Sequence, residues 1–273
     1  MIGVEEKVDI RDGIACGIRS DGRSRKQLRE FTVETGVSPH SCGSSIVKLE
    51  ETSVMATLSY EIVECEEEKG AFEIHVDSST TCMPGVQADA RLQYNAGVGQ
   101  QMSRLLGLTP TVIGAKSLIP LKELFIGEGQ CFSVKLDIQV LSVGGGAVEG
   151  CAALATRAAV ANFTLPHVNV VGATGGEGVS IEVDPSKTMN PLDGATLPLL
   201  LTFGVASSYV VSDPSAVEEQ ASTSSVHVGV VEGDVCFLKS SQCIAASDLP
   251  TIMHDAIVAA SEWERQLQEK LSS

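Results

Sequence analysis

Residues 132–163 read FSVKLDIQVLSVGGGAVEGCAALATRAAVANF, and this stretch decides the fold. From Phe132 to Val140 apolar and polar side chains alternate, which is the period of a half-buried strand. Three glycines, 144–146, interrupt the alternation. From Ala147 onward apolar residues recur at helical intervals, and most of them are small. The stretch predicts a strand, a glycine turn and a helix that can lie close to a sheet.

A strand that feeds a glycine turn and a helix is also a common form of phosphate site, because the N–H groups at a helix start attract anions. Here the turn continues with Ala147, Val148 and Glu149, without Arg, Lys, Ser or Thr. Glu149 favours the start of a helix but repels an anionic ligand. We therefore favour the interpretation that the glycines serve a tight turn over the interpretation that they bind phosphate.

The composition restricts the function of the chain. Its 273 residues carry a formal net charge of −16, which argues against binding of nucleic acid by the chain alone. Eight cysteines form no CxxC pair, and this pattern indicates reduced, buried thiols in an intracellular protein. The N-terminus has no apolar signal segment, and the apolar run 197–211 is too short to cross a bilayer, so we expect no membrane contact.

Strands followed by a helix occur twice along the chain, over residues 30–163 and 165–271. This order predicts an α/β (α+β) fold of two related strand-then-helix units. We divide it into an N-terminal helical arm, 1–20, a first unit, 21–196, and a second unit, 197–273. Besides 132–140, the expected strands are 31–35, 43–49, 53–64, 72–77, 116–125, 168–171, 180–183, 197–203, 208–212, 225–232 and 234–240.

Three expectations are local. The helix over 89–108 is expected to turn Leu92 and Ala96 inward. Residues 184–195 are expected to form a polar loop, and the strands from 208 to 240 to form a meander. Four basic residues follow the turn at residues 20–23, and we expect a solvated turn with one buried structural arginine among Arg23, Arg25, Lys26 and Arg29.

Common catalytic patterns are missing from the sequence. The spacing of Gly144, Gly146 and Gly150 is one residue away from the dinucleotide-binding fingerprint, and no G-x-S-x-G elbow occurs. The five histidines are scattered. Asp184, Asp193 and Asp213 lack the close pairing that a magnesium site needs. We expect no metal site and no cofactor.

An ordered set of short motifs resembles the RNase PH family over residues 20–271. The set comprises Asp21-Gly22-Arg23 with Arg29, the Gly43-Ser44 strand, Pro84-Gly85, the strand–glycine–helix unit and Asp213-Pro214 followed by Glu218-Glu219. The resemblance implies a fold of two related strand-and-helix units. It also implies either a phosphorolytic 3′-to-5′ exoribonuclease or an inactive relative in the six-membered ring of the RNA exosome.

The resemblance implies that the catalytic positions have been lost. Active members carry Gly-Thr-Arg at the central turn, where this chain has Gly146, Ala147 and Val148. They also carry two acids ahead of the run at Leu197, where the matching positions hold Asn190 and Thr196, with Asp193 nearby. Phosphorolysis needs a held phosphate dianion, so no catalytic residue is expected.

We therefore expect a non-catalytic ring subunit that supports RNA processing and degradation. Its expected partners are other RNase PH-like exosome subunits, RNA-binding cap subunits and RNA in the assembled channel, in the nucleus, nucleolus and cytoplasm. The alternatives are an active phosphate-dependent exoribonuclease and an unrelated small-molecule enzyme that uses the glycine turn.

Arg91 and Arg104 are the candidate RNA-binding residues. By resemblance, the helix over 89–108 lies beside the RNA path, and Arg91 matches a family arginine that touches the RNA backbone. We expect these two side chains, 13 residues apart, to lie within about 60° of each other around the helix.

Overall fold

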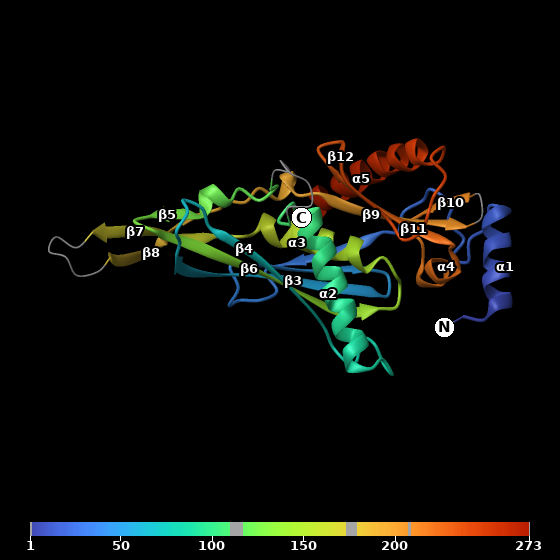
Figure 1. Ribbon diagram of the computed structural model, residues 1–273, viewed down its shortest axis with the longest axis horizontal. Coiled ribbons are helices and arrows are strands. Elements are labelled where there is room, and N and C mark those ends of the chain that lie inside the picture. Colours follow the sequence, from blue (N-terminus) through green and yellow to red (C-terminus); the bar gives the residue numbers. More distant parts are fainter. Residues whose placement is uncertain (1, 110–116, 173–178, 207–208, 273) are drawn as a thin grey trace.

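The computed structural model describes residues 2–109, 117–172, 179–206 and 209–272. Figure 1 shows two sheets, with helix α3 (Val148–Ala161) running between them. Helix α1 (Val4–Ala15) lies at one end of the molecule, and a hairpin of two strands extends from the other. Among the described residues, no helix has both the length and the apolar character needed to cross a bilayer. The mixed fold of strand-then-helix units is confirmed, while the division at residues 20/21 and 196/197 stays a prediction.

The first sheet has the strand order β1-β2-β3-β6-β4, with β5 paired to β6. Strand β4 is parallel to β6 and the remaining pairs are antiparallel. The connection between the two parallel strands carries helix α2 (Ala88–Leu105) and the short 3₁₀ helix η1 (Leu121–Leu124). Its strands are β1 (Phe31–Thr35), β2 (Gly43–Leu49), β3 (Thr52–Glu64), β4 (Ala71–Ser78), β5 (Phe125–Gly127) and β6 (Gln130–Val143).

The second sheet has the strand order β10-β9-β11-β12 and is antiparallel throughout. Helix α4 (Ala216–Ala221) connects β10 to β11, and helix α5 (Leu249–Leu271) covers the sheet. Strands β7 and β8 form the separate hairpin. The remaining bounds are β7 (Leu165–Gly172), β8 (Val179–Met189), η2 (Gly194–Thr196), β9 (Leu199–Ala206), β10 (Tyr209–Ser212), β11 (Ser224–Val231) and β12 (Asp234–Ser240).

Helix α3 packs against both sheets, and 12 of its 14 residues are buried. Small residues make this possible. A Cβ added to Gly150 would lie 2.9 Å from the carbonyl oxygen of Leu200 on β9. On the other side, a Cβ added to Gly43 on β2 would lie 2.6 Å from the carbonyl oxygen of Ala159. The predicted helix is therefore confirmed, but it is buried nearly all round rather than along one face.

The C-terminal helix joins the two sheets through Trp263. This side chain is buried and meets the ring of Phe31 edge-on, with 6.1 Å between ring centroids. Residues Ile252, Ala256 and Leu267 of α5 are also buried in the same core. The two sheets and their helices thus share one hydrophobic core.

Three sequence expectations about strands and loops are wrong. The strand expected over 116–125 is not formed. Residues 117–125 contain the 3₁₀ helix η1 and only the first residue of β5, and Lys116 lies outside the described residues. The expected loop 184–195 is strand up to Met189, because β8 pairs along the whole of β7. The expected meander is also wrong, since β11 pairs with β9 on the side opposite β10.

The expected inward face of the helix over 89–108 also needs correction. In α2 the outward residues include Leu92 and Ala96, and the buried face carries Asn95 and Val98. The N-terminal helix ends at Ala15, and Ile14 is its one buried residue.

All eight cysteines are free, and Cys131 and Cys151 are buried, whereas Cys16, Cys236 and Cys243 are exposed.

Candidate functional site

The turn between β6 and α3 is held in a tight, left-handed conformation. Gly146 has φ of +75° and Ala147, which caps the helix, has φ of +50°. A Cβ on Gly146 would lie 2.9 Å from the backbone nitrogen of Ala216 and 3.0 Å from the carboxyl carbon of Glu219. Glycine is thus required here both for its backbone conformation and for the close approach of α4.

Two side chains, one at the start of β3 and one just before β1, hold the turn through hydrogen bonds. Thr52 Oγ1 accepts the N–H of Gly145 at 3.0 Å and donates to the carbonyl oxygen of Gly146 at 2.8 Å. The guanidinium of Arg29 donates to the carbonyl oxygen of Gly145. These bonds pair with groups of the turn itself, which fits the tight-turn interpretation of the glycines.

A carboxylate occupies the start of helix α3. Glu219, on α4, accepts the backbone N–H of Ala147 through Oε1 at 2.7 Å. Burial raises the pKa of Glu219 to about 7, the hydrogen bond from Ala147 lowers it, and the charge of Glu149 raises it further. This helix N-terminus, the expected position of a phosphate in an active relative, therefore has an internal acid beside it.

The acid behind the turn is paired with a buried arginine. Asp213 accepts two bonds from the guanidinium of Arg29, at 2.9 Å and 2.6 Å, and one from its backbone N–H at 2.8 Å. Both side chains are 1% exposed. Burial lowers the pKa of Arg29, but its bonds and charge interaction with Asp213 outweigh burial and leave the pKa raised. Arg29 is therefore the buried structural arginine that the sequence predicts.

A second buried pair lies beside the first. Arg19 donates to both carboxylate oxygens of Glu218, at 2.9 Å and 2.6 Å, and Glu218 also accepts the N–H of Ser215 at 2.9 Å. The same glutamate closes a capping box at the start of α4. The arginine at position 19 was not among the expected buried residues, because no local pattern connects it to residue 218.

The three acids of the 213–219 segment are the site residues that sequence reasoning missed. The segment forms part of the motif set that resembles the family, but the resemblance implies acids at the turn from the stretch before Leu197. Ser215 and Glu218 form an S-x-x-E capping pattern, which is the local signal for α4. Only the fold brings Asp213 and Glu219 to a turn that lies about 70 residues earlier in the chain.

The residues expected at the acid positions lie at the wrong end of α3. Asn190 donates to the carbonyl oxygen of Val160, and a Cβ on Gly194 would lie 3.1 Å from the carbonyl oxygen of Arg157. Both contacts are in the last turns of the helix, about 14–18 Å from its start. The carboxylate of Asp193 accepts the N–H of Ala195. Asp193 and Thr196 therefore lie too far from the glycine turn to take part in it.

The other aspartates considered as metal ligands have separate local roles. Asp184, on the β7–β8 hairpin, accepts hydrogen bonds from the backbone N–H and hydroxyl of Ser186, and these bonds lower its pKa. Asp213 is paired with Arg29 as described above. Within the described ranges, no group of three or more His, Cys, Asp or Glu side chains could hold a metal ion.

Arg91 and Arg104 both lie on α2, but they do not share a face. At about 100° per residue, a separation of 13 residues leaves two side chains about 140° apart, so the expected separation of about 60° is wrong. Arg91 is partly buried, and its Nε is a buried donor without a hydrogen-bond partner among the described residues. Arg104 is exposed in the last turn of the helix.

The basic segment before β1 is used internally. Arg25 donates to the carbonyl oxygens of Ile14 and Ala15 and stacks over the ring of Tyr209 at 4.3 Å. Lys26 pairs with Asp255 at 2.8 Å. Arg23 pairs with Asp21 at 2.7 Å and with Asp213 at 3.2 Å. This segment therefore ties the N-terminal helix to the second sheet and to α5.

Comparison with known proteins identifies the class of protein. Residues 27–166 match the family model for the 3′ exoribonuclease family, domain 1, which is named RNase_PH. The match covers half of the chain and includes β1 to β6, the glycine turn and α3. The chain therefore belongs to the RNase PH family of 3′ exoribonucleases, and the resemblance found in the sequence is confirmed.

Particular relatives are exosome components. The chain is 28% identical over 230 residues to the exosome complex component Rrp42 of Methanothermobacter thermautotrophicus, covering 81% of this chain and 78% of the relative. It is 23% identical over 271 residues to Rrp42 of Methanopyrus kandleri, covering 97% and 95% of the two chains.

Solved structures share the fold over nearly the whole chain. An archaeal exosome core chain matches with a TM-score of 0.70 at 18% identity, covering 98% of this chain and 97% of that chain. A chain of the Archaeoglobus fulgidus exosome with RNA bound to the active site matches with a TM-score of 0.71 at 18% identity, covering 96% and 97%. At this level of identity the likeness defines the fold.

Proposed function

We propose that this chain is a non-catalytic ring subunit of an exosome, which supports 3′-to-5′ RNA processing and degradation through assembly. Membership of the RNase PH family and similarity to Rrp42 proteins support the ring role. The match to exosome core chains along almost the full length supports a complete ring-subunit fold.

The observation that carries the non-catalytic role is the start of helix α3. Val148 stands where the resemblance puts a phosphate-binding arginine, and the carboxylate of Glu219 takes the N–H of Ala147. Glu149 adds a second acid in the first helical turn. A phosphate dianion would meet carboxylates here instead of a guanidinium, and losing one positioned donor alone costs about 3 kcal/mol of transition-state stabilisation.

The buried cations near the turn do not replace the missing arginine. Arg29 is bonded to Asp213 and to the carbonyl oxygen of Gly145, and its side chain is 1% exposed. Withdrawing it to bind phosphate would break both guanidinium bonds to the buried carboxylate of Asp213 and leave that acid paired with Arg23 alone, at a cost of up to about 3–5 kcal/mol. The alternative of an active phosphate-dependent exoribonuclease has no comparable support from the turn.

A phosphorolysis assay tests the proposal. The purified chain is incubated with labelled single-stranded RNA, magnesium and inorganic phosphate, and release of nucleoside diphosphates is measured. We expect none above background, while an active family member in the same assay releases them. Release that requires phosphate would replace our proposal with the enzyme alternative.

The proposed partners follow from the ring role. They are paralogous RNase PH-like subunits, RNA-binding cap subunits and RNA in the assembled channel, and we propose the nucleus, nucleolus and cytoplasm as the locations. The net charge of −16 gives the chain little affinity for RNA alone, so basic neighbours would supply most phosphate contacts. Native mass of the complex from cell extract tests this, and a stable monomer would count against it.

Arg91 and Arg104 are the residues we propose for contact with RNA from this subunit. Arg104 is exposed, and Arg91 keeps a donor without a partner among the described residues. Because these residues diverge around α2, a single RNA path would meet one of the two.

A further inference from the structure

A groove lies at the end of α3 that is far from the glycine turn. Its volume is about 690 Å³, and three separate segments line it, namely residues 117–123 up to and within η1, the loop after β8 and the turn between β11 and β12. Leu118, Pro120, Pro191 and Val231 supply apolar walls. The groove is large enough for several side chains of a bound peptide segment.

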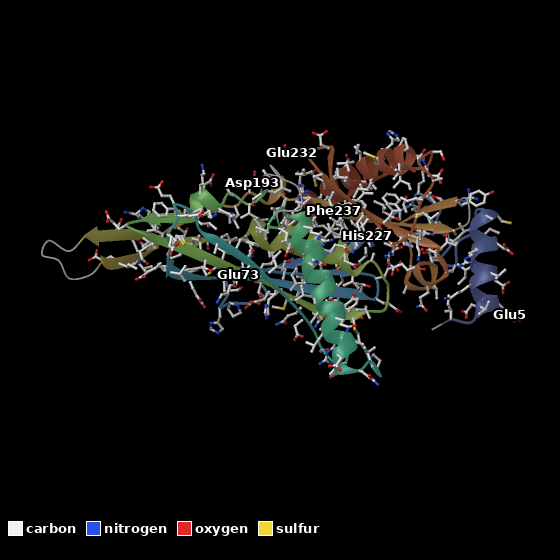
Figure 2. All side chains as sticks on the ribbon, viewed as in Figure 1. Glu5, Glu73, Asp193, His227, Glu232 and Phe237 are labelled. Carbon is white, nitrogen blue, oxygen red and sulfur yellow. The ribbon has the colours of Figure 1, made fainter. Side chains whose placement is uncertain are left out.

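The polar part of this groove is acidic. Glu123, Asp193 and Glu232 line it, one from each of the three segments, and Figure 2 labels the last two. All three residues are exposed. None of the eleven lining residues is basic, although Lys122 lies next to one of them in sequence. The groove therefore presents three carboxylates beside apolar walls, and none of them has an ion-pair partner among the described residues.

A smaller cavity of about 250 Å³ continues from the groove and shares Asn190, Leu192 and Asp193 with it. Its one basic lining residue, Arg157, is neutralised, since the guanidinium pairs with Glu264 and donates to the carbonyl oxygen of Ala195 at 3.1 Å. The carboxylate of Asp193 is therefore shared by the two hollows, and the smaller one adds no net positive charge.

We propose that this groove binds a basic segment of another protein, in which an apolar side chain is flanked by lysine or arginine. The apolar walls would take the apolar side chain, and Glu123, Asp193 and Glu232 would pair with the flanking cations. The charges come from three different segments, so the groove would select a residue pattern along the peptide rather than a single cation.

Other occupants fit less well. RNA would bring phosphates against three carboxylates, which is repulsive. A second copy of this chain is also a poor match, because its own basic segment is engaged internally in Arg19–Glu218, Lys26–Asp255 and Arg29–Asp213 pairs. The lining residues do not belong to the turn before α3, so this binding property is separate from phosphorolysis and from the charge of that turn.

The test uses the full chain and a fluorescent peptide in which one leucine is flanked on each side by two lysines or arginines. Binding is followed by fluorescence anisotropy at several salt concentrations. Glu123→Lys/Glu232→Lys reverses two exposed charges of the groove, and Leu118→Ser removes an apolar wall without changing charge. Glu64→Lys/Glu128→Lys is the matched control, since both residues line a separate acidic hollow. Circular dichroism checks that every variant is folded.

We expect the peptide to bind with a dissociation constant below 1 mM and the groove double variant to weaken binding at least about tenfold. Leu118→Ser should weaken it several-fold, and the control double variant should change it less than twofold. A peptide with glutamates in place of the cations should not bind. Absent binding, equal loss in the control variant, or displacement of the peptide by single-stranded RNA would overturn the proposal.

Discussion

Glu219 Oε1 accepts the backbone N–H of Ala147 at 2.7 Å, so an acid from the second half of the chain sits at the start of helix α3. Helix N-termini favour hydrogen-bond acceptors and negative charge, and here the acceptor is a carboxyl group of the protein itself. The bond joins α4 to the glycine turn across 72 positions of sequence. Because of this bond and the adjacent Arg29–Asp213 pair, we expect the free energy of unfolding to depend on pH and on substitutions at these residues.

The first prediction concerns pH. The pKa of Glu219 is raised from 4.5 to about 7 by burial and by Glu149, so the folded protein holds a proton that the unfolded chain releases between about pH 4.5 and 7. Stability from this group must therefore fall as pH rises through that window, by up to about 3 kcal/mol. Glu219→Gln should remove this part of the decline.

Urea unfolding of the wild type and of Glu219→Gln at pH 5, 6, 7 and 8 measures the effect. Glu123→Gln, at an exposed position, is the control and should leave the pH profile unchanged. Parallel profiles for the wild type and Glu219→Gln would show that the carboxyl group titrates normally in the folded protein.

The second prediction concerns the buried pair of Arg29 and Asp213. Asp213→Asn should lower the free energy of unfolding by up to about 3–5 kcal/mol, because it removes the buried counter-charge of Arg29 and leaves the guanidinium only the half-exposed carboxylate of Glu50, at 3.4 Å. Asparagine tolerates the φ of +48° at this position, so the substitution tests charge rather than backbone strain.

Chemical denaturation at pH 7 measures this loss. The control is Glu262→Gln, which breaks a pair with Arg265 whose side chain is 56% exposed, and it should cost less than about 1 kcal/mol. A loss for Asp213→Asn as small as that of the control would mean that the pair contributes no more than a surface ion pair.

The third prediction concerns the close packing of α3. Gly150→Ala should destabilise the protein, because the new Cβ would lie 2.9 Å from the carbonyl oxygen of Leu200, even though alanine is the better helix former. Gly97→Ala is the matched control, since Gly97 lies in α2 with nothing within 4 Å of its added Cβ. The control should gain up to about 1 kcal/mol, and thermal unfolding compares the two. Equal gains would contradict the described packing.

The fourth prediction concerns RNA contact in the reconstituted ring. Arg91→Glu or Arg104→Glu, but not both, should weaken RNA binding and lower the salt slope by about one unit, because the two residues diverge around α2. Lys48→Glu, on β2, is the control with the same change of charge. RNA affinity at several salt concentrations measures the effect. An intact ring with unchanged affinity and slope in both variants would leave this helix without a role in RNA binding.

Local pattern predicted the elements whose period is unbroken. In β6, apolar and polar side chains alternate between the two faces of the strand. Directly after the glycines, the apolar residues of α3 follow helical spacing. The same reasoning failed over residues 117–125, where Pro120 and a single turn at Leu121–Leu124 give too few residues for a period. It also failed for Leu92, because the buried face of α2 is set by where β4 lies and not by where its apolar residues are.

The contacts that build the candidate site could not be predicted from the sequence, because they join segments that only the fold brings together. The sequence contains both the glycine turn and the acidic segment after β10, but nothing local states that Glu219 reaches Ala147 or that Asp213 reaches Arg29. The burial of α3 on all sides is non-local in the same way, since its second partner, β9, begins 38 residues after the helix ends. The spacing of apolar residues along a helix indicates one buried face, and it does not indicate that a second sheet covers the opposite face.

The pairing of Arg29 with Asp213, which are 184 residues apart, sets the order of events during synthesis. When the ribosome has completed β6 and α3, the guanidinium of Arg29 can pair with the half-exposed carboxylate of Glu50 but not yet with the buried carboxylate of Asp213. Early closure around Arg29 would bury the guanidinium with Glu50 as its one acidic partner among those already made, so we expect the nascent sheet to open readily near β1 until residue 213 emerges. Protease cleavage near β1 in stalled nascent chains should therefore persist until that length and then stop.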